Sequence, residues 1–336
     1  MSKRVLITGG AGFVGSQLGF ALDQAGCEVI LLDNMSDGHE DNLVIDGRRF
    51  GRFEKMDARD KQVESLLSGV DTVFHFAGTS SLPKCQVDPA AAYDNNVTAV
   101  LNMLECSRRA GVRRFTFSST SAVYENNKTT PFSESDPVAP DLVYASTKYA
   151  AEQACAGFAS TYGMDVIVAR FFNVYGEHQD IHRTMPPFIS YLAREVFFGR
   201  RPVLFNNTDA ERDYVYVGDI IACMRKMMDS EQHFTGDVFN ICSGTGYSVP
   251  QIARLYGEIA GQTIDPEYRD PTGFWDKFPG LFEGAYPLSR KRIEAEVYKR
   301  SLGNPDKAAE TFGFRTSMAL DEGLRRFHAY SVAHLG

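Results

Sequence analysis

The chain of 336 residues is longer than one compact core usually absorbs, so we expect a large domain with a smaller lobe. Its net charge of -8 argues against nucleic acid as a partner, because a phosphate backbone is bound through a surplus of Lys and Arg. No secretory signal is recognisable and no apolar run approaches the roughly 20 residues that span a bilayer, so we expect a cytoplasmic protein without a membrane partner.

The first half of the chain alternates short apolar segments with longer helical patterns. The predicted buried strands, rich in β-branched and aromatic residues, are 5–8, 29–33, 52–56, 72–76 and 114–117. The predicted helices between and after them are 14–25, 61–67, 89–109 and 143–161. This alternation predicts an α/β fold, a doubly wound parallel sheet of the Rossmann type.

The pattern is less regular in the second half. Further strands are expected at 166–170 and 236–241, and helices at 187–198, 218–229 and 249–260. We expect residues 1–172 plus about 213–242 to form the Rossmann domain. Residues 173–212 plus about 243–330 should form a smaller mixed α/β substrate lobe. The aromatic-rich stretch 271–287 could be an ordered lid, an interface loop or a satellite packing cluster.

A glycine-rich turn follows the first strand and opens a helix. Gly9, Gly12 and Gly15 would allow a sharp turn and the approach of a pyrophosphate, which the N–H groups and dipole of the helix N-terminus favour. Asp33 ends the second strand, where a carboxylate binds ribose hydroxyls and repels the 2′-phosphate of NADP. The first Arg or Lys after it is Arg48, so we expect NAD as the cofactor.

A phenol and an ammonium lie on one face of the predicted helix 143–161. Tyr144 and Lys148 are four residues apart, and a nearby cation favours the phenolate form of a general base. Thr120 follows the fifth strand, where hydroxyls reach a ligand at the carboxyl edge of the sheet. The six cysteines and seven histidines are scattered, so no metal site is expected.

Together these motifs resemble the extended short-chain dehydrogenase/reductases, specifically the NAD-dependent epimerase/dehydratase group of nucleotide-sugar enzymes. The resemblance runs from Thr8 to about Phe327. It implies a catalytic set of Thr120, Tyr144 and Lys148. The cofactor contacts that we expect are Gly9, Gly12, Phe13, Val14, Gly15, Asp33, Asn34, Asp57, Ala58, Phe76, Ala77, Gly78, Asn96, Ser118, Tyr144, Lys148 and Phe171.

Three further segments resemble the parts of the family that bind a nucleoside diphosphate. They are 170–176 (R-F-F-N-V-Y-G), 185–188 (M-P-P-F) and 212–217 (R-D-Y-V-Y-V). The guanidinium of the last segment suits phosphate oxygens, which it can pair bidentately. The implied substrate contacts are Thr120, Tyr144, Asn173, Pro187, Phe188 and Arg212.

The residues after Thr120 select among the reactions of the family. The 4,6-dehydratases usually carry Asp-Glu where this chain has Ser121 and Ala122, and the glucuronate decarboxylases keep the Glu. Glucuronate 4-epimerases tend to have Thr or Ser at the position of Asn173, and reductases commonly prefer NADP. The chain is therefore most similar to the UDP-hexose 4-epimerases, which act through a 4-keto intermediate and hydride transfer to and from bound NAD.

Three alternatives remain: a 4-keto-sugar reductase, another nucleotide-sugar dehydratase or epimerase, and a dinucleotide-binding protein without turnover.

The stretch 273–298 is roughly 20 residues longer than the resemblance leads us to expect. The second arginine that the family uses for the diphosphate could therefore be Arg290, Arg292 or Arg269. By resemblance we also expect a homodimer through helices 89–109 and 143–161.

Overall fold

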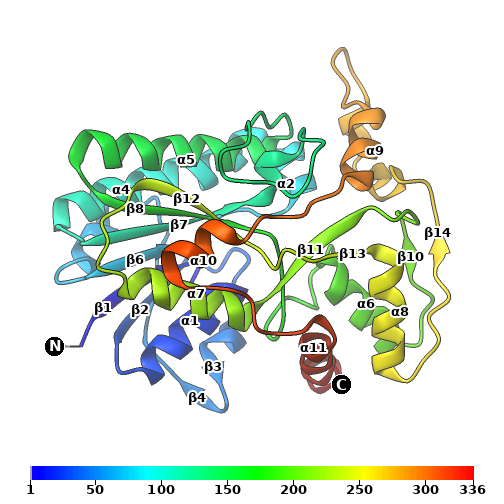
Figure 1. The fold of residues 1–336 in the computed structure, drawn as a ribbon, viewed down its shortest axis with the longest axis horizontal. Helices are drawn as coiled ribbons and strands as arrows, with labels where there is room; N and C mark the ends of the chain where they lie inside the picture. Colours follow the sequence, from blue (N-terminus) through cyan, green and yellow to red (C-terminus); the bar gives the residue numbers. More distant parts are fainter. Residues whose placement is uncertain (1) are drawn as a thin grey trace.

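The computed structural model describes residues 2–336, and its centre is a seven-stranded parallel sheet (Figure 1). The strand order is β12-β8-β7-β6-β1-β2-β5, and every neighbouring pair is parallel. This confirms the predicted doubly wound α/β fold. The strands are β1 (Arg4–Thr8), β2 (Glu28–Asp33), β5 (Arg52–Lys55), β6 (Thr72–His75), β7 (Arg114–Thr120), β8 (Asp165–Phe171) and β12 (Thr235–Ile241).

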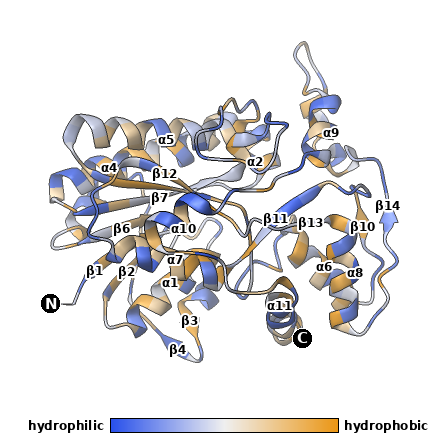
Figure 2. Ribbon diagram, in the orientation of Figure 1, coloured by the Kyte–Doolittle hydropathy of each residue, from blue (hydrophilic) through white to orange (hydrophobic). Residues whose placement is uncertain are grey.

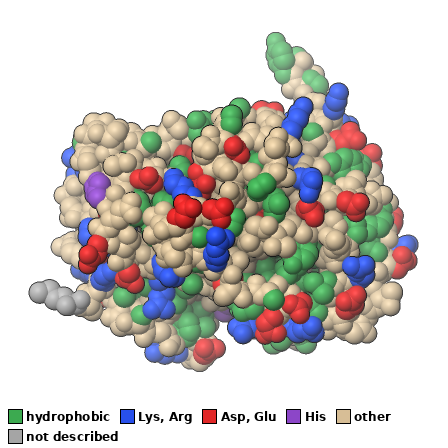
Figure 3. All heavy atoms as spheres, in the orientation of Figure 1, with side chains coloured by type: hydrophobic (Ala, Val, Ile, Leu, Met, Phe, Trp, Pro, Cys, Tyr) green, Lys and Arg blue, Asp and Glu red, His purple; other side chains and the backbone are tan. Residues whose placement is uncertain are grey.

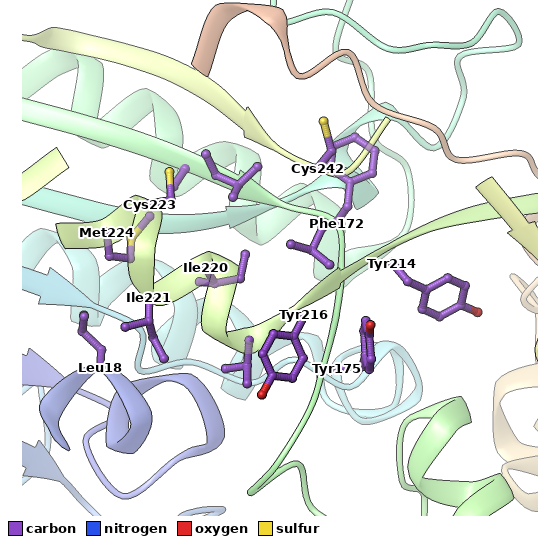
Figure 4. Packing of buried hydrophobic residues seen from close by; sticks show 14 of the residues in the cluster. Leu18, Phe172, Tyr175, Tyr214, Tyr216, Ile220, Ile221, Cys223, Met224 and Cys242 are labelled. Atoms are coloured by element: carbon purple, nitrogen blue, oxygen red, sulfur yellow. The ribbon is translucent and has the colours of Figure 1, made fainter. Parts of the chain in front are cut away.

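Helices cover both faces of the sheet because successive residues of each strand point to opposite sides. On β1, Val5 and Ile7 belong to the core beneath α1 (Phe13–Gln24) and α7 (Val217–Asp229). Leu6 belongs to the opposite core, beneath α4 (Ala99–Ala110) and α5 (Val143–Tyr162). The central strands are buried on both faces, which explains the hydrophobic residues along them in Figure 2. In Figure 4, Leu18 of α1 points toward Ile221 of α7.

Two predicted helices have a different form. Residues 61–67 were expected to be a helix but form a short 3₁₀ helix, Lys61–Leu66, whose first turn is capped when Asp60 accepts a hydrogen bond from Gln62 N. The predicted helix 89–109 is divided into α3 (Pro89–Tyr93), a π-helical turn (Asp94–Thr98) and α4. Such turns often mark functional positions, and this one carries Asn95 and Asn96.

The second half of the chain builds a smaller sheet beside the first (Figure 1). Its order is β13-β11-β9, with β9 (Asn173–Tyr175), β11 (Glu211–Tyr216) and β13 (Gly246–Ser248). Helices α6 (Phe188–Phe197), α8 (Val249–Ala260) and α11 (Leu320–Leu335) pack against one another in this region. Since β8 leads directly into β9 and β11 into α7, the chain crosses repeatedly between the two sheets. The exact residue ranges of the two domains stay a proposal.

The remaining elements are short. They are β3 (Val44–Ile45), β4 (Arg48–Arg49), α2 (Leu82–Val87), β10 (Val203–Leu204), β14 (Glu267–Tyr268), α9 (Arg290–Tyr298) and α10 (Asp306–Phe312). The stretch 273–298, which we call the inserted segment, contains two 3₁₀ turns and α9. It packs Trp275 and Ile293 against Leu142, which precedes α5. The loop between its second 3₁₀ turn and α9 projects from the body (Figure 1), and hydrophobic side chains lie at the tip of this projection (Figure 3). Tyr286 of this loop is 98% exposed.

Candidate active site

The glycine-rich turn between β1 and α1 forms one wall of a long cavity at the carboxyl edge of the sheet. Gly9 has φ +69°, and a Cβ there would lie 2.9 Å from the Ala77 nitrogen. A Cβ on Gly15 would collide with the Gly9 carbonyl oxygen. Helix α1 begins after Gly12 without a side-chain cap, so its first N–H groups are available to a phosphate in the cavity.

Replacing Gly15 with Ala is expected to weaken NAD binding about 5- to 150-fold, because relieving the collision costs roughly 1–3 kcal/mol and displaces the turn. NAD released from the purified, denatured protein would measure the effect. Gly157→Ala in α5 is the matched control, since an added Cβ there meets no atom within 4 Å. Wild-type NAD content in Gly15→Ala would contradict this assignment.

The adenosine end of the cavity is marked by Asp33. Its carboxylate is 8% exposed and accepts hydrogen bonds from Ala11 N (3.1 Å) and Met35 N (2.8 Å), while burial raises its pKa. Asn34 donates to Asp57 at 2.9 Å, and the guanidinium of Arg59 holds the pKa of Asp57 well below its usual range. An acceptor that is partly desolvated in this way suits ribose hydroxyls and disfavours an additional phosphate.

Nearly all of the expected cofactor residues line this cavity. They are Gly9, Gly12, Phe13, Val14, Gly15, Asp33, Asn34, Asp57, Ala58, Phe76, Ala77, Gly78, Ser118, Tyr144, Lys148 and Phe171. The glycine cradle, the free helix N-terminus and the buried acceptor together fit a dinucleotide.

Asn96 is the exception: it does not line the cavity, and its expected cofactor contact stays a prediction. It is 1% exposed. Its side chain accepts from Thr79 N (2.7 Å) and donates to Thr147 Oγ1 (2.9 Å), so it joins the cavity wall to α5. The π-helical turn presents its neighbour Asn95 to the cavity instead. Asn96 therefore supports the wall of the cavity through Thr79 and Thr147.

Thr120, Tyr144 and Lys148 come together at the middle of the cavity. Burial raises the pKa of Tyr144 to about 12, although a hydrogen bond with Thr120 acts in the opposite direction. Burial lowers the pKa of Lys148 to about 8, and its ammonium lies 4.4 Å from the centre of the Phe117 ring. A buried phenol beside a hydroxyl and an ammonium can exchange a proton with a ligand hydroxyl.

A second pocket, which we call the inner pocket, shares Thr120 and Tyr144 with the dinucleotide cavity. Its other polar walls include Asn173 and Arg212, Glu296 near the end of the inserted segment, and Lys299, which directly follows that segment. Ser121 and Ala122 also line it. The inner pocket is therefore where a second ligand can meet the cofactor at Tyr144.

Arg212 also lines a third pocket, which we call the outer groove. The guanidinium donates to the carbonyls of Glu296 (2.7 Å) and Val297 (3.1 Å), and it forms no ion pair with a carboxylate of residues 2–336. The groove is mostly apolar and aromatic. Its lining includes Met185, Pro186, Phe188, Tyr191, Leu204, Phe205, Arg269, Phe274 and Lys277.

The other expected substrate residues are placed as follows. Asn173 lines the inner pocket and donates to the Asp213 carbonyl at 2.8 Å, and Phe188 lines the outer groove. Pro187 lines the dinucleotide cavity, and its expected substrate contact stays a prediction. Arg170, from the same motif as Asn173, lies below the site in a buried ion pair with Glu152 at 2.6 Å.

The three candidate arginines for the diphosphate, Arg269, Arg290 and Arg292, lie in different surroundings. Arg292 pairs with Glu125 (2.8 Å) and Asp141 (2.6 Å), and Arg290 pairs with Asp276. Only Arg269 of the three candidates lines the outer groove. The cation that joins Arg212 in the inner pocket is a lysine, Lys299, which the sequence did not single out.

Arg183 is a second residue that the sequence did not indicate. It lines the dinucleotide cavity, and its buried Nε has no hydrogen-bond partner among residues 2–336. A cation without a protein partner is suited to a phosphate of the ligand.

In the described residues, no group of three His, Cys, Asp or Glu side chains is placed to hold a metal. No helix there is long and apolar enough to cross a membrane.

Comparison with known proteins identifies the family of the chain. Residues 5–242 match the model of the NAD-dependent epimerase/dehydratase family. A UDP-glucose 4-epimerase of Corynebacterium glutamicum is 31% identical over 276 residues, which cover 79% of this chain and 82% of that protein.

Solved structures are similar along almost the whole chain. The UDP-glucose 4-epimerase of Thermotoga maritima, solved with UDP-glucose, has a TM-score of 0.86 at 30% identity and covers 99% of this chain and 100% of that one. A UDP-N-acetylglucosamine 4-epimerase of Methanobrevibacter ruminantium, in complex with UDP-N-acetylmuramic acid, has a TM-score of 0.86 at 26% identity, with 99% of both chains covered.

Proposed function

Because the chain belongs to the NAD-dependent epimerase/dehydratase family, we propose that its substrates are UDP-hexoses that differ in configuration at C4. The pair is UDP-glucose and UDP-galactose, or their N-acetylated forms, as the names of the similar proteins suggest. The reaction class is NAD-dependent epimerisation of a nucleotide sugar, and NAD supplies a hydride acceptor that returns the hydride within one turnover.

One observation carries the proposal: Thr120 and Tyr144 line both the dinucleotide cavity and the inner pocket. A sugar carbon in the inner pocket would thus face the cofactor across the phenol. Arg212 lines both the inner pocket and the outer groove, so a diphosphate beside it would place the base in the groove and the hexose against Tyr144.

The roles of the chain's own residues follow from this placement. Tyr144 takes a proton from the sugar hydroxyl and returns it, and Thr120 orients the phenol. The backbone nitrogen of Ala122 donates to Thr120 Oγ1 at 3.1 Å and so fixes that hydroxyl in turn. Lys148, on the cofactor side, holds ribose hydroxyls and favours the phenolate.

Dehydration is disfavoured because Ser121 and Ala122, which line the inner pocket, cannot supply the acid and base that eliminate water. The carboxylate that does line it, Glu296, is paired with Lys299 at 2.6 Å and with Arg292 at 3.4 Å.

The decisive assay incubates the NAD-loaded protein with each UDP-hexose and its N-acetyl form and separates the products. Interconversion of one C4 pair is expected without added cofactor, and no interconversion of any pair would refute the proposal. Net oxidation of added reduced cofactor by a keto sugar would instead indicate a reductase.

We also propose a homodimer formed through α4 and α5. Val100 and Leu104 of α4 are buried against the sheet, whereas Leu101 is 42% exposed, as is Tyr93 of α3 at 43%. These outward side chains offer a second apolar face on the helices that we expected to associate. Analytical ultracentrifugation of wild type and Leu101→Glu tests this: the variant should sediment as a monomer.

A further inference from the structure

The end of the inserted segment and the residue that follows it contribute a pair of opposite charges to the inner pocket. Glu296 lies in the last turns of α9 and Lys299 directly follows it. Their side chains are each 14% exposed, they pair at 2.6 Å, and both line the pocket that contains Tyr144. Neither residue lines the outer groove, so the pair faces the sugar end of a bound nucleotide sugar.

The position of this pair is fixed from both sides. After Lys299 the chain is joined to β11, because Ser301 N donates to the Glu211 carbonyl and Asp213 N donates to the Ser301 carbonyl. Before it, α9 is held by Arg292, which pairs with Asp141 and Glu125 of the dinucleotide-binding side. Arg292 therefore joins α9 to the dinucleotide-binding side, and Arg212 joins it to β11 by donating to the Glu296 and Val297 carbonyls, so both contacts are made without the Lys299–Glu296 pair.

The two cations of the inner pocket differ in the charge they can offer. Arg212 has no carboxylate partner and is positioned for a phosphate, whereas the charge of Lys299 is balanced by Glu296. Burial also lowers the pKa of Lys299, which reflects how little water reaches it. A carboxylate on the hexose would thus meet a second carboxylate in a poorly solvated pocket, and like charges there are costly.

We propose that Lys299 and Glu296 form a specificity-determining pair that binds the hydroxyls of an uncharged hexose and excludes hexoses that carry a carboxylate. This inference rests on the proposed function. A hydroxyl both donates and accepts hydrogen bonds, and the pair presents a donor beside an acceptor. The same two groups can therefore bind hydroxyls in either orientation of the ring, as epimerisation requires. A uronate would instead bring a second carboxylate to an ammonium that Glu296 already balances, which disfavours it.

The test compares UDP-glucose with UDP-glucuronate by calorimetry on the NAD-loaded protein. Wild type is expected to bind the hexose at least tenfold more tightly. Glu296→Gln leaves the ammonium unbalanced and should shift the ratio of the two dissociation constants at least tenfold toward the uronate. Lys299→Met should weaken both ligands and leave the uronate excluded. Glu294→Gln, at an exposed position of α9, is the matched control and should keep the wild-type ratio.

An unchanged ratio in Glu296→Gln, with a melting temperature near that of wild type, would overturn the proposal. If that variant is unstable, Lys299→Met must still leave the uronate excluded, and preferential uronate binding by it would overturn the proposal equally. Deuterium from heavy water appearing at a ring carbon in wild type but not in Glu296→Gln would do so too, since Glu296 would then transfer protons. Because the ratio of dissociation constants reports binding whether or not the bound sugar is epimerised, a protein that binds UDP-glucose but does not epimerise it would fail the proposed function alone.

Discussion

Replacing Tyr144 with Phe is expected to lower kcat by about 100- to 10,000-fold, the usual contribution of a positioned general acid or base. The substitution removes one hydroxyl and retains the ring, so the buried site at the start of α5 stays filled. NAD content should remain that of wild type, because the glycine turn and Asp33 are untouched. This one variant therefore distinguishes an enzyme, which loses turnover but keeps NAD, from a non-catalytic dinucleotide-binding protein, which has no turnover to lose.

Tyr149→Phe is the matched control, five residues further along α5 and only partly buried. It should keep kcat within about twofold, as surface substitutions usually do. The same loss in both variants would mean that α5 has been disturbed, and wild-type turnover in Tyr144→Phe would exclude the phenol from the reaction.

The pH dependence of turnover follows from the same phenol. Its pKa of about 12 leaves it protonated near neutral pH until the positive nicotinamide ring of oxidised NAD adds a further charge beside it, which would lower that pKa. Since the deprotonated form is the base, wild-type kcat should rise with pH up to the lowered pKa and then level. The residual rate of Tyr144→Phe should lack this limb.

Some of the site could be predicted from sequence because its signals are local. Gly9, Gly12 and Gly15 lie between a strand and a helix, and Asp33 ends the next strand, so topology alone brings them to one edge. Thr120 and Tyr144 are separated in sequence. Thr120 ends β7 and Tyr144 lies in the first turn of α5, so both come to the carboxyl edge of the sheet.

Other parts could not be predicted, for physical reasons that differ. The π-helical turn changes which asparagine faces the cavity, yet it leaves the apolar pattern of the helix 89–109 almost unaltered. Lys299 and Glu296 reach the inner pocket only because residue 301 pairs with β11 and Arg292 holds α9, which are contacts between distant parts of the chain. For the aromatic-rich stretch 271–287, the sequence left an ordered lid, an interface loop and a satellite packing cluster open. It proves to be ordered, with Trp275 in a small core and Phe274 in the outer groove.

Replacing Arg212 with Met is expected to reduce kcat/KM for the UDP-sugar by about 30- to 4,000-fold. Removing one partner of a buried, charge-assisted contact costs roughly 2–5 kcal/mol. Arg212→Lys should recover part of this loss, because it keeps the charge but not the bidentate geometry. Arg269→Met is the control in the same groove. That guanidinium is 57% exposed and already paired with Glu267, so its loss should cost about tenfold or less.

Arg212 also donates to two carbonyls at the end of α9, and its loss could act through the position of Glu296 and Lys299. Affinity for UDP alone separates the two effects, because UDP lacks the hexose that these residues face. If Arg212 binds the diphosphate, Arg212→Met weakens UDP about as much as UDP-hexose. If it only positions α9, UDP affinity stays near that of wild type while UDP-hexose affinity falls, and the ratio between glucose and glucuronate forms shifts as well. The first result is expected, because a guanidinium without a carboxylate partner lies where both substrate pockets meet.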